Sequence, residues 1–171
     1  MLLTFSLRTF VIDQHGRDAR EADGQALVEF ALVLPFVVLL LIAIADFGIA
    51  YQRTAQITNA TREGARYGSL FPTRIDSGAH ADPANIKYRV KAEATGIALG
   101  DADIEIFYEE ANINPPPAHD ASAPGASVWA VTGNGMRVRA STSYSPMTPF
   151  AAMLFPGGVV HLSATSVMRI E

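Results

Sequence analysis

The residue with the sharpest chemical meaning is Glu29, a carboxylate within a long apolar run. The run extends from Ala26 to Ala45, and Glu29 is its only charged residue. A carboxylate in such a run is costly in a membrane, so it is normally functional and has a partner. Burial of this carboxylate among apolar helices would require a positive partner.

The other reactive side chains form no recognisable catalytic or metal-binding motif. The four histidines lack metal-ligand spacing, the serines lack a G-x-S-x-G context, and no P-loop or GxGxxG motif is present. The acidic residues from Asp101 to Asp120 could hold a cation, but they lack the glycine and closing glutamate of an EF-hand, and a solvated acidic face is the preferred interpretation. We therefore expect no enzyme activity, no metal and no cofactor.

Composition narrows the classes further. The chain has 171 residues, a net charge of −4 and no cysteine. Its length allows about one domain besides a membrane segment. The negative charge argues against nucleic acid as a partner. The lack of cysteine excludes disulfides and thiol chemistry.

The element that positions Glu29 is a helix long enough to cross a membrane. A helix of this run rises about 30 Å, the thickness of the hydrocarbon core. Pro35 removes one backbone donor within it, and we weigh a kink that shapes helix packing equally against a harmless membrane proline. Helical spacing continues outward, so one helix of ~68 Å from Gln25 to about Leu70 is expected. Gly64, Gly68 and Pro72 should mark its end.

The outer half of this helix should carry one face for a globular domain. The residues that recur at spacings of three and four are Phe47, Ala50, Tyr51, Ala55, Thr58 and Arg62.

Two stretches carry a family resemblance. Gly24, four further residues and then Glu29-Phe30 at the head of an apolar helix resemble the processing site of type IV pilins and pseudopilins. The sequences DFG at 46–48 and TNATREGARY at 58–67 are similar to the TadE-like pseudopilins of the Flp/Tad pilus system. The resemblance covers residues 24 to about 70 and returns weakly at 162–169.

The resemblance implies a minor pseudopilin, a structural component of a Flp-type pilus or its secretion machinery. A prepilin peptidase would cut between Gly24 and Gln25, leaving Glu29 as the fifth residue. Glu29 and Phe30 would then serve subunit assembly, with the free amine of Gln25 on a neighbouring subunit as the positive partner. The other implied partners are further Tad pilins and pseudopilins, inner-membrane assembly proteins and the membrane itself.

The implied organisation is a leader at 1–24, a transmembrane helix at 25–45, its outer continuation at 46–70 and an extracytoplasmic domain at 71–171. Arginines flank the apolar run equally on both sides, so the expected orientation, with the N-terminus in the cytoplasm, comes from the resemblance. The expected location is the cytoplasmic membrane.

Other readings stay open. Ala43-Ile44-Ala45 fits a signal-peptidase site that would release a soluble domain beginning at Asp46. The run could also be a simple anchor or signal for a binding domain or an enzyme, with Glu29 as an interfacial acid that has no partner. An anchor does not need a glutamate five residues after a glycine, which favours the pseudopilin interpretation.

The outer part is expected to be α+β and pilin-like. A three- or four-stranded antiparallel sheet and a short second helix should pack on the outer half of the long helix. The expected elements are a loop at 71–83, a helix at 84–99, a strand at 103–109, a long mobile loop at 111–126, a hairpin of 127–132 and 136–144 around Gly133-Asn134-Gly135, an apolar segment at 150–155 and a last strand at 159–170.

Overall fold

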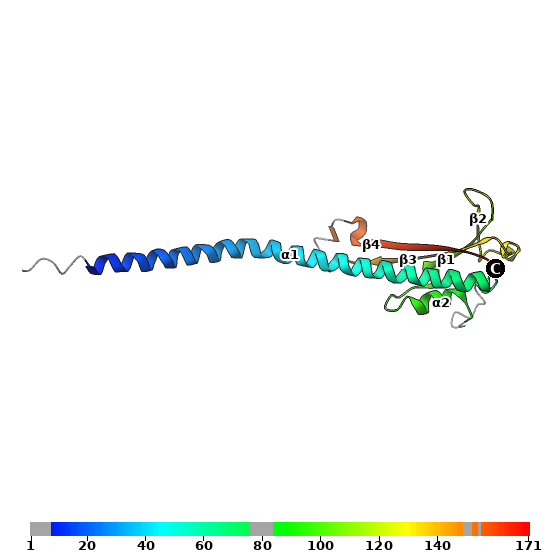
Figure 1. Ribbon diagram of the computed structural model, residues 1–171, viewed down its shortest axis with the longest axis horizontal. Helices are drawn as coiled ribbons and strands as arrows, with labels where there is room; N and C mark the ends of the chain where they lie inside the picture. Colours follow the sequence, from blue (N-terminus) through cyan, green and yellow to red (C-terminus); the bar gives the residue numbers. More distant parts are fainter. Residues whose placement is uncertain (1–7, 76–83, 149–151, 154) are drawn as a thin grey trace, which may run out of the picture. The chain divides into compact units, whose positions relative to one another are not determined.

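The computed structural model describes the backbone of residues 8–75, 84–148, 152–153 and 155–171, and the side chains among these from residue 24 onward. The chain divides into two compact units, Met1–Ala45 and Asp46–Glu171. The described elements are the helices α1 (Arg8–Leu70) and α2 (Ile86–Glu93), the strands β1 (Ile104–Glu109), β2 (Ala118–Asp120), β3 (Gly135–Tyr144) and β4 (Val160–Arg169), and the short 3-10 helices η1 (Asp101–Asp103), η2 (Ala126–Trp129) and η3 (Pro156–Gly158). The α+β class is confirmed (Figure 1).

The helix α1 ends at Leu70, as its sequence predicts, but it begins at Arg8 rather than Gln25. Most of the residues before the apolar run are compatible with a helix, which explains the earlier start. Pro35 lies inside α1. Gly64 and Gly68 do not end the helix, because both are used for packing, as described below.

The four strands form one antiparallel sheet in the order β2-β1-β3-β4. Strand β3 is central and pairs with β1 on one side and β4 on the other, for example through Ile106↔Val138 and Ala140↔Ala164. The strands predicted at 103–109 and 159–170 are confirmed as β1 and β4.

The predicted hairpin around Gly133-Asn134-Gly135 is wrong. Residues 126–129 form the 3-10 helix η2, and β3 does not pair with this segment. Asn134 connects distant parts instead: its side-chain amide donates to Trp129 O (3.0 Å), its side-chain oxygen accepts from Ala111 N (3.0 Å), and its carbonyl accepts from Ile170 N (2.8 Å). The pairing of β3 with β1 and β4 therefore decides the local structure, and the turn residues at 133–135 do not form a hairpin with residues 127–132.

Two further expectations need correction. The predicted loop 111–126 contains β2, which pairs with β1, and the His119 ring stacks on Trp129 with centroids 3.9 Å apart. The second helix is shorter than 84–99, since the chain turns after Glu93 and Gly96 adopts φ +82. Half of the apolar segment 150–155 and most of the loop 71–83 lie outside the described residues.

Within the outer unit, α1 and α2 contribute to one core with the inward face of the sheet. The buried stripe of α1 consists mainly of small residues: Ile57, Ala60, Thr61, Gly64, Ala65 and Gly68. The sheet supplies the bulk through Ile104, Ile106, Tyr108, Met136 and Val138. Thr61 Oγ1 and Ser166 Oγ lie 3.0 Å apart and join α1 to β4. The expected face on the outer half of α1 is therefore present, but it does not include Phe47 and Tyr51, which are 74% and 69% exposed.

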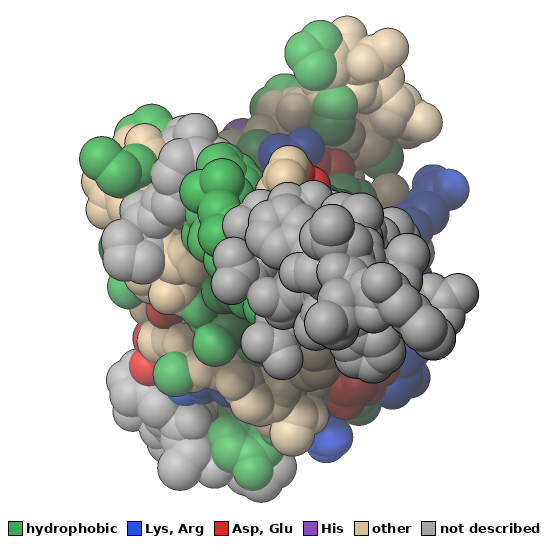
Figure 2. Space-filling view, turned by 90° about the vertical axis from the view of Figure 1, so that its left-hand side faces the viewer, with side chains coloured by type: hydrophobic (Ala, Val, Ile, Leu, Met, Phe, Trp, Pro, Cys, Tyr) green, Lys and Arg blue, Asp and Glu red, His purple; other side chains and the backbone are tan. Residues whose placement is uncertain are grey.

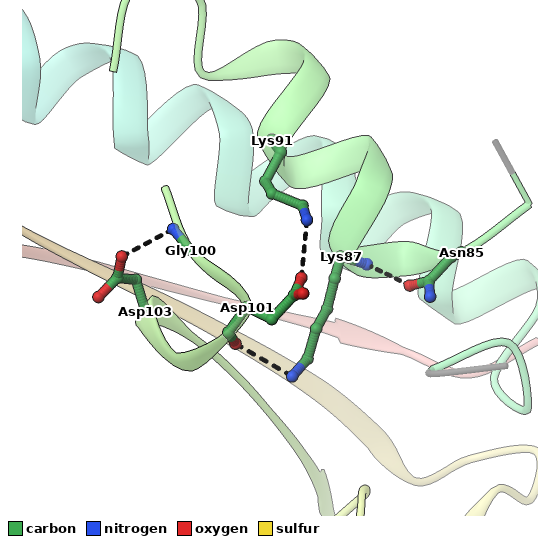
Figure 3. Close-up of polar contacts among 6 residues, drawn as sticks. All are labelled: Asn85, Lys87, Lys91, Gly100, Asp101 and Asp103. Atoms are coloured by element: carbon green, nitrogen blue, oxygen red, sulfur yellow. Dashed lines mark hydrogen bonds and ion pairs between the residues drawn. The ribbon is translucent and has the colours of Figure 1, made fainter. Parts of the chain in front are cut away.

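Polar contacts fasten α2 to the turn before β1 (Figure 3). Lys91 Nζ lies 2.7 Å from Asp101 Oδ1, and Lys87 Nζ donates to Asp101 O at 3.1 Å. Asp103 Oδ2 accepts from Gly100 N at 2.8 Å. These basic and acidic residues therefore bind each other as well as facing solvent.

Candidate functional site

The apolar part of α1 exposes nearly all its side chains. Every residue from Gly24 to Ala45 is exposed except Ile42, which is half-exposed. Among the described helices, the segment Gly24–Leu70 is long and apolar enough to cross a membrane. Figure 2 shows a column of hydrophobic side chains, in green, near the middle of the view. An exposed and apolar surface of this length indicates a segment that contacts lipid or other helices.

Glu29 lies near the start of this surface, and its neighbour one turn earlier contacts it. Gln25 Nε2 donates to Glu29 Oε1 at 3.0 Å, an exposed i,i+4 contact along α1. Residues 25 and 29 therefore share one face of the helix. A carboxylate has further acceptor positions, so this arrangement leaves room for a cationic donor from another chain.

The remaining predicted site residues lie on the same helix without burial. A Cβ built on Gly24 would meet nothing within 4 Å, so packing gives no reason for a glycine here. Phe30 is 63% exposed. Pro35 is in the middle of the run, inside the helix. The structure thus groups Gly24, Gln25, Glu29 and Phe30 within two turns, and Pro35 lies farther along.

Sequence reasoning did not assign a role to Asp46, the first residue of the outer unit. Its side chain is only 6% exposed and accepts hydrogen bonds from Tyr144 Oη (2.7 Å), Met147 N (2.9 Å) and Thr148 Oγ1 (3.4 Å). The hydrogen bond from Tyr144, supported by those from Met147 and Thr148, lowers the pKa of Asp46 below its ordinary value. The sequence signal that could have pointed to Asp46 is its position as a charged residue directly after the apolar run.

The acidic segment 101–120 is largely engaged in pairs. Arg137 contacts the buried carboxylate of Glu109, and His119 Nε2 lies 2.8 Å from Glu110 Oε1. Among the residues that the structure describes, no group of three or more His, Cys, Asp or Glu side chains could hold a metal ion. These acids therefore stabilise the sheet and its connections.

Comparison with family models gives one match for the N-terminal part of the chain. Residues 24–66 match the family model described as TadE-like protein. This segment is TadE-like. Comparisons with curated proteins and with solved structures gave no match.

The TadE-like segment begins at Gly24 and covers both the apolar run and most of the buried stripe of α1. The resemblance predicted from residue 24 to about residue 70 is thereby confirmed over residues 24–66, and the weaker one at 162–169 stays a prediction. It includes Glu29 near the start, Asp46 at the unit boundary and Gly64 in the core. The match and the exposed apolar helix concern the same part of the chain.

Proposed function

We propose that this chain is a minor pseudopilin of a Flp-type (Tad) pilus or of its secretion machinery. It would be inserted in the cytoplasmic membrane by residues 25–45, with the N-terminus in the cytoplasm and the unit from Asp46 outside. A prepilin peptidase would cut after Gly24, and the mature chain would act through assembly with other pilins and pseudopilins.

The observation that carries the proposal is the TadE-like match that begins at Gly24 on an exposed apolar helix. Within that helix Glu29 is the single charge of the run from Ala26 to Ala45. A lone membrane anchor gains nothing from a carboxylate at this depth, whereas packed helices can use it to set their register.

Cleavage would supply the partner for Glu29. The new α-amino group of Gln25 would be positive at neutral pH, since its ordinary pKa is about 7.7–8.0. In the uncut chain the Gln25 side chain already occupies the face of Glu29, at 3.0 Å. The amine of a neighbouring subunit would add a charge-assisted bond, which is stronger where water is excluded.

The decisive experiment is the N-terminal sequence and intact mass of the protein from native membranes. A chain that begins at Gln25 supports the pseudopilin assignment. A chain that begins at Asp46 means that the outer unit is released by signal peptidase, and Glu29 then has no role in assembly. An uncut chain in cells that carry the peptidase means that the run is a simple anchor.

A matched pair of glycines sharpens this test. A Cβ added at Gly24 or at Gly48 would meet no atom within 4 Å, so a side chain at either position starts in open space. We expect Gly24→Val to abolish cleavage because the peptidase loses its small residue before the cut. Gly48→Val should be cut normally. Cleavage at Gln25 in the Gly24→Val protein would show that the site is misassigned.

A further inference from the structure

The start of the connection from β3 to β4 is hydrogen-bonded to Asp46, the residue directly after the apolar run. Asp46 follows Ala45 directly and holds Tyr144, the last residue of β3, together with the backbone of Met147. One peptide bond separates Asp46 from the end of the run. The backbone at Met147 is therefore hydrogen-bonded to the residue that directly follows the run.

The described apolar side chains of this connection are exposed. Met147 is 70% exposed, Met153 is 84% exposed and Phe155 is 40% exposed. Figure 1 shows the described part of the connection, in orange, beyond the ends of β3 and β4. Large exposed apolar groups within one connection mark a surface made for a partner or a membrane.

The first turns of α1 beyond Ala45 carry the side chains expected at a membrane–water interface. Phe47 and Tyr51 are both exposed and lie one turn apart, as aromatic residues do at the headgroup level. Arg53 lies about 10 Å beyond Asp46 along the helix. Its guanidinium stands 4.9 Å from the centre of the Tyr144 ring, at a height suited to anionic headgroups.

We propose that Met147, Met153 and Phe155 form a second membrane contact, seated in the interfacial layer of the bilayer that residues 25–45 cross. The inference rests on the proposed membrane anchoring. A lipid surface is the occupant because the contact continues the apolar run through Asp46. The buried Asp46 carboxylate suits this level, since Tyr144, Met147 and Thr148 replace the water that it would otherwise require. Contacts of this kind reach about 5–10 Å into the headgroup and acyl boundary.

The chain lacks cysteine, so single-cysteine variants report one position each. The full-length protein would carry Met147→Cys or Met153→Cys, labelled with the fluorophore NBD, in vesicles of phosphatidylethanolamine and phosphatidylglycerol at high lipid excess. Val128→Cys is the matched control, because Val128 is 67% exposed on η2, against 70% for Met147. Leu40→Cys within the run reports insertion of the helix itself.

We expect NBD at 147 and 153 to shift its emission to shorter wavelength and to be quenched by lipids that carry a shallow nitroxide, with no change at 128. If the label at position 40 is quenched while the labels at positions 147 and 153 behave like the control at 128, the second contact is overturned and the membrane anchor stands. A blue shift at 147 without lipid quenching would also overturn it, because a second copy of the chain would then cover the site. Absence of quenching at 40 would refute the membrane anchor and the second contact together.

Discussion

Gly64 is the position of α1 where one added methyl group should be most damaging. A Cβ there would lie 2.3 Å from Val90 Cγ2 of α2 and 3.5 Å from Val138 Cγ1 of β3. Both valines are fully buried, so the near methyl group has no free space to enter. The substitution Gly64→Ala must therefore push α2 away from α1 or force Val90 into a poor rotamer.

The size of the effect follows from two opposing contributions. Overpacking a well-packed core costs about 1–3 kcal/mol. Replacing glycine by alanine inside a helix gains about 1 kcal/mol. Because 2.3 Å is far inside van der Waals contact, the upper part of the first range applies. We expect a net loss of about 1–2 kcal/mol in the free energy of unfolding, or roughly 2–8 °C in Tm for a chain of this length.

The assay is thermal unfolding of the full chain in detergent micelles, followed by the fluorescence of Trp129, the sole tryptophan. Gly48→Ala is the control on the same helix, since its Cβ would meet nothing within 4 Å, and it should leave Tm unchanged or raise it. In a Val90→Ala background, Gly64→Ala should no longer destabilise, because the new methyl group enters the vacated space. Equal melting of the Gly64→Ala and Gly48→Ala proteins would refute this packing.

Three further predictions concern charged groups. Glu109→Gln removes a buried carboxylate that contacts Arg137 on β3, and it should lower the free energy of unfolding in urea by about 1–3 kcal/mol. The control Glu105→Gln changes a pair whose two side chains are both 52% exposed, so it should lower that free energy by at most about 1 kcal/mol. Equal losses in the two variants would contradict the burial of Glu109. Because the folded pKa of Asp46 is lowered, its contribution to stability is present above the ordinary value of 3.8 and lost as pH falls through the folded value. Tyr144→Phe removes the main cause, so unfolding curves between neutral and acidic pH should show a smaller acid loss than the parent chain. Glu29→Ala should leave peptidase cleavage intact and block incorporation into pili, with Glu29→Gln similarly defective; normal pili in either variant would refute the ion pair.

The parts of this fold that are local in sequence could be predicted. The apolar run, the end of α1 at Leu70 and the alternating strand β4 follow from periodicity, and each needs only neighbouring residues to specify it. The family resemblance at 24–66 was likewise carried by contiguous motifs. The candidate site residues around Glu29 could be named for the same reason.

The parts that depend on distant partners could not. The Gly133-Asn134-Gly135 signal is that of a hairpin, but Asn134 is hydrogen-bonded to residues as far away as Ala111 and Ile170. Strand β2 has three residues and no alternation of its own, so its pairing with β1 is specified by the sheet edge that it joins. Asp46 was missed as a structural residue because its donors lie about a hundred positions later in the chain.

The buried face of α1 shows why residue size misleads in this helix. The residues that recur at helical spacing included Phe47 and Tyr51, which are exposed, but not Gly64 and Gly68, which are buried. The sheet already fills the core with large side chains, so the helix can approach only through small residues such as Gly64 and Gly68. The aromatic face is thereby left free, and it continues the exposed apolar surface of the run outward. One helix thus presents small residues to its own domain and leaves the large side chains of Phe47 and Tyr51 exposed.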